Sequence, residues 1–218
     1  GKPNQRETVT LIGACVTFGV VLNLLPGAME GLRTSISLLE FVPGLSIRLE
    51  LEPLGMMFAL IASFLWIVSS IYSIGYMRGK NEDHQTRFFV CFALAIGSAL
   101  TVALAGNMLT LFIAYEVLSL STYPLVAHHQ NAEARKGGRI YLGYLLTTSI
   151  GLLLFGMVWT WQLTGTLEFK PGGILEGHIG QAGAALLLIL YMFGIGKAAL
   201  MPFHRWLPAA MVAPTPVS

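Results

Sequence analysis

The stretch from Leu109 to Val126, LTLFIAYEVLSLSTYPLV, holds one charged residue, Glu116, in the middle of an apolar run. A second stretch, from Ala182 to Met201, AGAALLLILYMFGIGKAALM, holds one charged residue of the opposite sign, Lys197. Both runs are close to the roughly 20 residues that cross a bilayer as a helix. A charge at the bilayer centre costs about 2.5–3.5 kcal/mol. The two residues therefore need compensation within the protein, and they are the first candidates for a functional site.

The composition is typical of a membrane protein. Hydrophobic residues make up 55% of the chain and charged residues only 11%, against about 25% in a soluble domain. The net charge of +2 and the lack of a basic arm exclude a nucleic-acid-binding class. The two cysteines, Cys15 and Cys91, lie in apolar runs, which favours packing over a disulfide or a metal pair. We therefore predict an all-α, polytopic transmembrane helical bundle.

Six apolar runs are long enough to span the bilayer. Lipid offers the backbone no hydrogen-bond partners, so each spanning segment has to be helical. Only Gly106 and Asn107 separate the third run from the fourth, which predicts a tight turn at the membrane surface. We assign the whole of residues 1–218 to one transmembrane domain. The predicted spans are residues 8–27, 53–77, 88–105, 108–127, 140–163 and 181–201.

Two segments depart from plain spanning helices. Residues 45–52, LSIRLELE, alternate apolar and polar side chains, which predicts a short surface strand between spans one and two. Pro53 then opens the second helix. Gly194, Gly196 and Pro202 bracket Lys197, which predicts one broken helix, as in transport sites built on interrupted spans.

Basic residues are unequally divided between the two sides of the membrane. Cytoplasmic loops carry the excess of Lys and Arg. Nine basic residues fall on one side of the predicted spans and three on the other, which predicts a multi-pass protein of the cell inner (plasma) membrane with both ends cytoplasmic. The nine are Lys2, Arg6, Arg78, Lys80, Arg87, Arg135, Lys136, Arg139 and Arg205, and the three are Arg33, Arg48 and Lys170.

Glu116 and Lys197 are the candidates for proton transfer. The Glu116 side chain is too short to reach water from mid-span, so it is neutral, paired or beside water, which suits a group that takes and releases protons. The alternative is a protonated glutamate that only hydrogen-bonds a neighbouring helix. Lys197 lies nearer the end of its run and could extend to the interface instead, but a desolvated lysine exchanges its proton readily. We expect electrostatic coupling between the two.

Other polar residues have weaker claims. His204 fits a proton relay because histidine titrates near neutrality, or else an interfacial belt with its Arg and Trp neighbours. Tyr144, Thr147 and Thr148 in the fifth span form a candidate hydrated path, or else hydrogen-bond neighbouring helices. The adjacent His128 and His129 are interpreted as interface anchors and not as a metal site, and we predict no metal.

Recognisable redox and hydrolytic centres are missing from the sequence. The single aspartate, Asp83, lies in a loop, which excludes a paired-aspartate intramembrane protease. There is no cysteine cluster for an iron–sulfur centre and no dinucleotide-binding fingerprint. We therefore predict no cofactor.

Three stretches closely resemble one known family. They are Gly194–Met211 with Ala213–Ser218, Phe64–Ile67 with Ile71–Arg78, and Tyr115–Tyr123. These stretches resemble the antiporter-like subunits of respiratory complex I, of multisubunit Mrp-type cation/proton antiporters and of membrane-bound hydrogenases, and the resemblance covers nearly the whole chain.

The resemblance implies a proton-translocating membrane subunit in which Glu116 and Lys197 form the proton-transferring pair. It implies other membrane subunits as partners, a lipid bilayer around them, and protons exchanged with Na⁺ or K⁺. The family has further helices and a second symmetry-related half, so we expect this chain to be a piece of a longer protein. The stretch Tyr115–Tyr123 and the His128–His129 loop are most similar to the D-type branch of the Mrp subunits.

Two alternatives stay open beside that prediction. One is an antiporter-like subunit of an NADH:quinone oxidoreductase of complex I type, or of a hydrogenase, which would make the chain part of an enzyme. The other is a membrane scaffold that transports nothing and buries both charges for packing.

Overall fold

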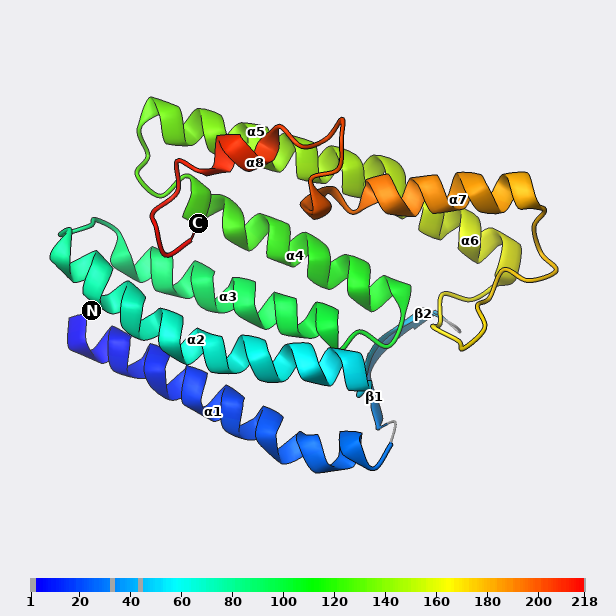
Figure 1. Cartoon of the computed structure of the whole chain (residues 1–218), viewed down its shortest axis with the longest axis horizontal. Coiled ribbons are helices and arrows are strands. Elements are labelled where there is room, and N and C mark those ends of the chain that lie inside the picture. The colour runs from blue at the N-terminus through cyan, green and yellow to red at the C-terminus, as the bar shows by residue number, and fades with distance from the viewer. Residues whose placement is uncertain (1–2, 32–33, 43–44, 218) are drawn as a thin grey trace.

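The computed structural model describes residues 3–31, 34–42 and 45–217 of the chain. Long helices run side by side along one axis, and a small sheet closes one end of the bundle (Figure 1). The elements in order are α1 (Pro3–Met29), β1 (Ser35–Val42), β2 (Leu45–Glu50), α2 (Pro53–Gly79), α3 (Gln85–Ala103), α4 (Met108–Val126), α5 (Ala132–Thr148), a π-helical stretch (Ser149–Leu154), α6 (Phe155–Thr164), α7 (Gln181–Gly194), a 3₁₀ turn (Gly196–Ala198) and α8 (Trp206–Ala210).

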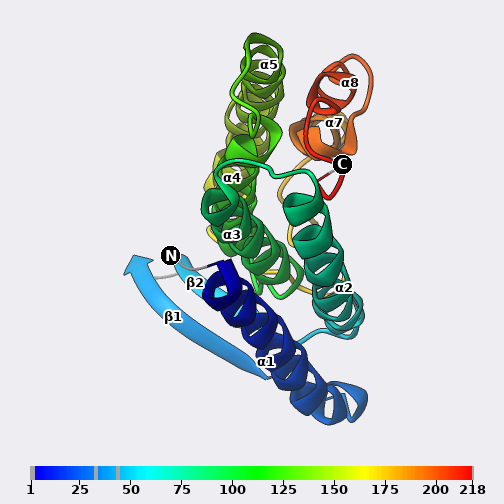
Figure 2. The same ribbon diagram turned by 90° about the vertical axis from the view of Figure 1, so that its left-hand side faces the viewer.

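The predicted all-α transmembrane bundle is confirmed. Within the described ranges, five helices are long and apolar enough to cross a membrane, counting α5, the π-helical stretch and α6 as one helix from Ala132 to Thr164. The helices α3, α4 and α5 form a row, with α2 beside α3, α1 beside α2, and α7 and α8 beside α5 (Figure 2). The chain is therefore a multi-pass membrane protein.

The sixth predicted span is shorter than expected. The run over residues 181–201 was predicted as one span, but α7 ends at Gly194 after 14 residues. At about 1.5 Å per residue this helix is about 21 Å long, which is less than the roughly 30 Å of a bilayer core. Lys197 therefore follows the end of a helix that stops inside the bundle.

The surface strand predicted over residues 45–52 is one half of a hairpin. β2 is present, and Pro53 opens α2 as expected. The partner strand β1 was missed because register shifts between Ser37 and Leu39 and between Glu40 and Val42 interrupt its alternation of side chains. A pattern search for period two fails at such bulges.

The hairpin is joined to the end of the bundle formed by the α3–α4 turn. Arg48 forms ion pairs with Glu50 at 3.1 Å and with Glu168, which precedes α7, at 2.9 Å. Asn107 caps α4 by accepting the Thr110 N–H at 2.8 Å, and its Nδ2 donates to the Ser46 carbonyl at 2.7 Å. The predicted turn at Gly106-Asn107 is therefore both a cap and a contact for the hairpin.

The opposite end carries most of the basic residues, and we call it the basic end. Glu7 of α1, only 6% exposed, accepts hydrogen bonds from the guanidinium group of Arg78 at the end of α2. Arg6 donates to the Gln85 side chain at the start of α3 at 2.6 Å. Seven of the nine basic residues of the predicted cytoplasmic side lie on these helix ends: Arg6, Arg78, Lys80, Arg87, Arg135, Lys136 and Arg139. Of the other basic residues, Lys2 and Arg33 lie outside the described residues.

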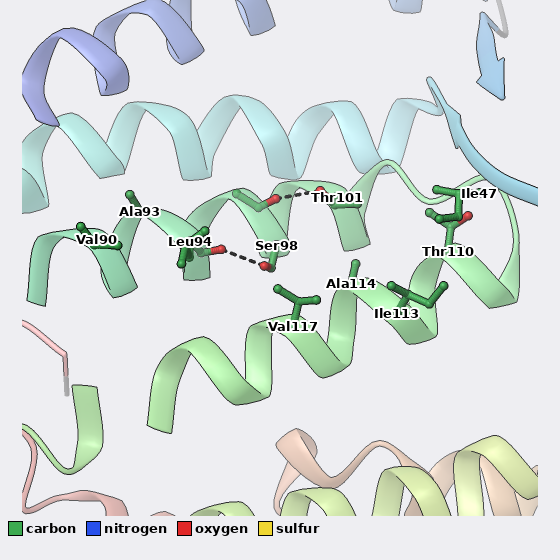
Figure 3. Close-up of a pocket in the computed structure, with 11 residues that line it drawn as sticks. Ile47, Val90, Ala93, Leu94, Ser98, Thr101, Thr110, Ile113, Ala114 and Val117 are labelled. Carbon is green, nitrogen blue, oxygen red and sulfur yellow. Dashed lines mark hydrogen bonds between the residues drawn. The ribbon is translucent and has the colours of Figure 1, made fainter. Parts of the chain in front are cut away.

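Small residues between α3 and α4 line an open groove instead of a tight contact. The groove measures about 550 Å³ and includes Ala93, Gly97 and Ala114 (Figure 3). A methyl group added at Gly97 would meet nothing within 4 Å. Ser98 and Thr101 donate to carbonyls of their own helix, at 2.8 and 2.9 Å, so their hydroxyls are satisfied. The small-residue spacing at Ala93 and Gly97 thus shapes an outer surface.

Candidate functional site

The break after α7 is the most irregular backbone inside the bundle. The helix stops at Gly194, a short 3₁₀ turn holds Lys197, and Ala199 has a left-handed φ of 51°. The chain then turns back, and α8 packs along α5 (Figure 1). Lys197 therefore lies at a helix discontinuity, as the bracketing Gly and Pro residues predict.

Two glycines let the break approach the neighbouring helix closely. A Cβ at Gly194 would lie 2.7 Å from the backbone nitrogen of Leu153, and one at Gly196 would lie 2.2 Å from Oγ1 of Thr148. Leu153 belongs to the π-helical stretch, and Thr148 immediately precedes it. Such stretches are rare and are often found at functional sites. Two irregular backbone segments thus pack against each other here.

Side chains satisfy the backbone groups that the break exposes. The Lys197 N–H donates to the Tyr115 hydroxyl at 3.0 Å, and the Trp206 indole N–H donates to the Gly196 carbonyl at 2.9 Å. Lipid offers no such partners, so irregular backbone at membrane depth depends on neighbouring protein groups. Tyr115 comes from α4 and Trp206 from α8, so both neighbours maintain the break.

The Lys197 ammonium group lies between two tyrosine rings. Its Nζ is 5.2 Å from the centroid of the Tyr115 ring and 5.5 Å from that of Tyr141. It also donates a hydrogen bond to the Tyr141 hydroxyl at 3.2 Å. Aromatic faces attract cations, by about 2 kcal/mol when the site is desolvated. The site therefore favours a positive charge without neutralising it.

Glu116 lies on the same helix as Tyr115, and the structure leaves one of its oxygens without a partner. The side chain is half-buried, and its Oε1 is buried with no hydrogen-bond partner among the described residues. The charges of Glu116 and Lys197 interact through space, but the two side chains form no direct ion pair in the described chain. A buried, unpartnered carboxyl oxygen in a native structure needs an explanation, such as a proton or a water.

The other predicted site residues are scattered. His204 is exposed, and no hydrogen bond or ion pair of the described residues joins His204, Tyr144 or Thr147 to Lys197. Thr148 lies against Gly196, but its hydroxyl donates to carbonyls of its own helix. These contacts do not assemble a path through Tyr144, Thr147 and Thr148.

Sequence reasoning missed the residues that surround Lys197. Tyr115, Thr122, Tyr141 and Trp206 are brought together from α4, α5 and α8. The hydroxyl-rich half of the fifth span was a signal for Tyr141, since that side chain does bond another helix. No signal in the sequence pairs Tyr115 or Trp206 with the break, because these contacts join segments far apart in the chain.

His128 is more deeply buried than an interface anchor. It is 3% exposed, packs edge-on against Phe88 at 5.6 Å, and its carbonyl accepts from Arg87 at 2.8 Å. Burial, with the charge of Arg87, lowers the pKa of His128 below its ordinary value. Next to it, Nδ1 of His129 lies 3.4 Å from Oε2 of Glu82. In the part of the chain that the structure describes, no three His, Cys, Asp or Glu side chains are placed to hold a metal ion.

Two family models match the chain. Residues 105–218, just over half of the chain, match the model described as NADH:quinone oxidoreductase/Mrp antiporter, TM. Residues 43–89 match the model described as NADH-Ubiquinone oxidoreductase (complex I), chain 5 N-terminus. The first match contains Glu116, Tyr141 and Lys197.

Individual proteins agree with the family models. A Rhizobium meliloti protein, named as a probable K(+)/H(+) antiporter subunit of the A/B type, is 32% identical over 218 residues, which is 96% of this chain and 21% of the relative. A chain of the Mrp complex from a Dietzia species superposes with a TM-score of 0.81 at 19% identity, covering 99% of this chain and 40% of that one. A chain of the membrane-bound sulfane sulfur reductase, an archaeal respiratory membrane complex, superposes with a TM-score of 0.83 at 20% identity, covering 97% and 43%.

The chain thus spans about a fifth of the length of that curated relative. At 20% identity or less, the two solved structures show the fold alone. The family model that matches more than half of the residues shows the family. The chain belongs to the NADH:quinone oxidoreductase/Mrp antiporter family of transmembrane subunits.

Proposed function

We propose that the chain moves protons within a multisubunit cation/proton antiporter of the Mrp type, using Glu116 and Lys197 as its proton-transferring pair. The curated relative is named as an A/B-type component of a K(+)/H(+) antiporter, so we propose the A-type branch in place of the D-type branch. The partners are then other membrane subunits, and the exchanged cation is K⁺ or Na⁺.

The observation that carries this proposal is the setting of Lys197. Its ammonium group lies at a helix break inside the bundle, between two tyrosine rings and without a direct carboxylate partner among the described residues. A lysine held for stability alone is better served by an ion pair, because an unpaired charge at membrane depth is expensive. A lysine that changes its charge during a transport cycle needs polar neighbours that tolerate both states.

Glu116 supplies the second charge. When Glu116 is ionised, its charge favours a protonated Lys197, and when Glu116 takes up a proton this support is lost. Because the two side chains do not touch, each is free to exchange its proton with a different neighbour. Coupling of this kind lets the arrival of one proton promote the release of another.

The uneven division of basic residues supports an orientation with the basic end in the cytoplasm of a cell inner membrane. We propose that protons move between that side and the pair. His204, and the path through Tyr144, Thr147 and Thr148, stay predictions that the described contacts do not join to Lys197.

The test is transport by the full-length protein in its assembled complex, reconstituted in vesicles or assayed in inverted membranes. We expect Lys197→Ala and Glu116→Gln to abolish cation-driven proton movement while the amount of assembled complex is unchanged. Lys80→Ala, at the exposed end of α2, is the matched control and keeps transport. Normal proton movement in both site variants would contradict the proposal and leave the scaffold interpretation.

The complex I alternative has an observation of its own, since residues 43–89 match a complex I model. The same vesicles distinguish the two. Proton movement that starts on addition of K⁺ or Na⁺ supports the antiporter, and proton movement that requires NADH and a quinone supports the oxidoreductase.

A further inference from the structure

Tyr141 joins Lys197 to the helix that carries Glu116. Its hydroxyl accepts a hydrogen bond from Lys197 Nζ at 3.2 Å and is also hydrogen-bonded to Oγ1 of Thr122 on α4. Tyr141 is 5% exposed, so its hydroxyl meets these partners away from bulk water. We propose that Tyr141 and Thr122 form a hydroxyl relay through which Lys197 exchanges its proton with the basic end of the bundle. This inference rests on the proposed function.

The hydrogen bonds of this group can all point in one direction. Oγ1 of Thr122 lies 2.8 Å from the Leu118 carbonyl, to which its single proton can be donated. With Thr122 donating there, the Tyr141 hydroxyl donates to Thr122 and receives a proton from Lys197. Every bond then runs away from the ammonium group, which is the alignment that release of a proton from Lys197 requires.

The relay also leads toward one side of the membrane. Thr122 lies six residues beyond Glu116 on α4, which at 1.5 Å per residue is about 9 Å nearer the basic end. Its side chain is half-buried, whereas that of Tyr141 is buried. The relay therefore runs from the enclosed ammonium group to a more accessible hydroxyl.

The proton transfer balances with water as the final acceptor. The Lys197 ammonium group gives one proton to the Tyr141 oxygen, Tyr141 gives its own hydroxyl proton to Thr122, and Thr122 gives its own to a water molecule. One N–H and two O–H bonds break, and three O–H bonds form. Lys197 becomes a neutral amine, the water becomes hydronium, and no electrons change owner.

Trp206 positions the Tyr141 ring for this role. The two rings meet edge to face at 5.5 Å, and the same indole N–H holds the Gly196 carbonyl beside Lys197. One side chain therefore fixes both the acceptor hydroxyl and the backbone next to the donor.

The relay is tested in the full-length protein within its assembled complex. Because proton transfer by a positioned side chain contributes about 10²–10⁴-fold, Tyr141→Phe should lower proton flux by about 100-fold or more while keeping the ring. Thr122→Val should do the same, and Thr122→Ser should restore flux. Tyr123→Phe is the control, because Tyr123 lies at the same α4–α5 contact and its hydroxyl makes no hydrogen bond within the described residues.

A double variant separates a relay from a structural role. Two members of one relay act in series, so Tyr141→Phe with Thr122→Val should lose no more flux than either change alone. Losses that multiply, or flux in Tyr141→Phe within about twofold of the unmodified protein, would overturn the relay. If Tyr141→Phe fails to accumulate in the membrane, Thr122→Val and Thr122→Ser decide the question by the same criterion.

Lys197→Ala, measured in parallel, keeps the two proposals distinct. Flux that survives Lys197→Ala overturns the proposed function and the relay with it. Flux that is lost in Lys197→Ala but normal in Tyr141→Phe overturns the relay alone.

Discussion

The helices α4 and α7 each carry one charged residue at membrane depth, but they hold it differently. α4 is continuous through Glu116, and the backbone of that residue is part of the helix. α7 ends three residues before Lys197, and side chains from other helices complete its hydrogen bonds. A short carboxyl group needs only a place on a helix, whereas a long lysine at a break is directed and stabilised by its neighbours. The lysine site should therefore be the more sensitive of the two to changes in the surrounding residues.

The largest effect should come from Lys197→Arg. Arginine keeps the positive charge but stays protonated, so it cannot release a proton. We expect proton movement in the assembled complex to be lost, with normal membrane insertion. Lys80→Arg is the control. Normal transport by Lys197→Arg would make Lys197 a fixed positive charge and remove the difference in role between the two helices.

Gly196→Ala should be next. The added Cβ would lie 2.2 Å from Oγ1 of Thr148, and overpacking of this kind costs about 1–3 kcal/mol. The expected result is a lower midpoint of thermal unfolding in detergent and weaker transport, with partial recovery in the double variant with Thr148→Ala. Gly143→Ala, where a Cβ meets nothing within 4 Å, should keep the midpoint. Equal midpoints for the two glycine variants would show that the break tolerates displacement.

Tyr115→Phe tests the contribution of α4 to the break. The change keeps the ring near Lys197 but removes the acceptor of the Lys197 N–H. A buried donor without a partner costs about 1–3 kcal/mol, and we expect a several-fold loss of transport with partial loss of stability. Tyr123→Phe on the same helix is the control. An unchanged midpoint and unchanged flux would mean that water replaces the hydroxyl.

The smallest effect should come from His128, beyond the end of α4. Its pKa is lowered in the folded chain, so the unfolded chain binds more protons as the pH falls. Its contribution to stability is therefore complete above about pH 6.5 and is lost as the pH falls through the lowered folded value. We expect the thermal midpoint of the unmodified protein to fall more between about pH 7 and pH 5 than that of His128→Phe. Parallel midpoints would show that another group controls the pH dependence.

Local patterns predicted the elements whose cause is local. Apolar runs predicted the spanning helices, because each has to satisfy its own backbone in lipid. Pro53 predicted the start of α2, and Gly194, Gly196 and Pro202 predicted a break at Lys197. The strand β1 was missed because its bulges interrupt the pattern. Nothing in the residues of the fifth span indicated the π-helical stretch at Ser149–Leu154.

By itself the sequence determined that this protein spans a membrane, that Glu116 and Lys197 lie in its apolar interior, and that the helix of Lys197 is interrupted. These properties follow from the cost of exposing charges and backbone groups to lipid, which acts on each segment separately. Only the tertiary structure decided which groups meet the ammonium group. Tyr141 is 56 residues from Lys197 in the chain and 19 from Thr122, and Tyr115 is 82 residues from Lys197. Their contacts depend on how α4, α5 and α7 pack together, which no single segment specifies.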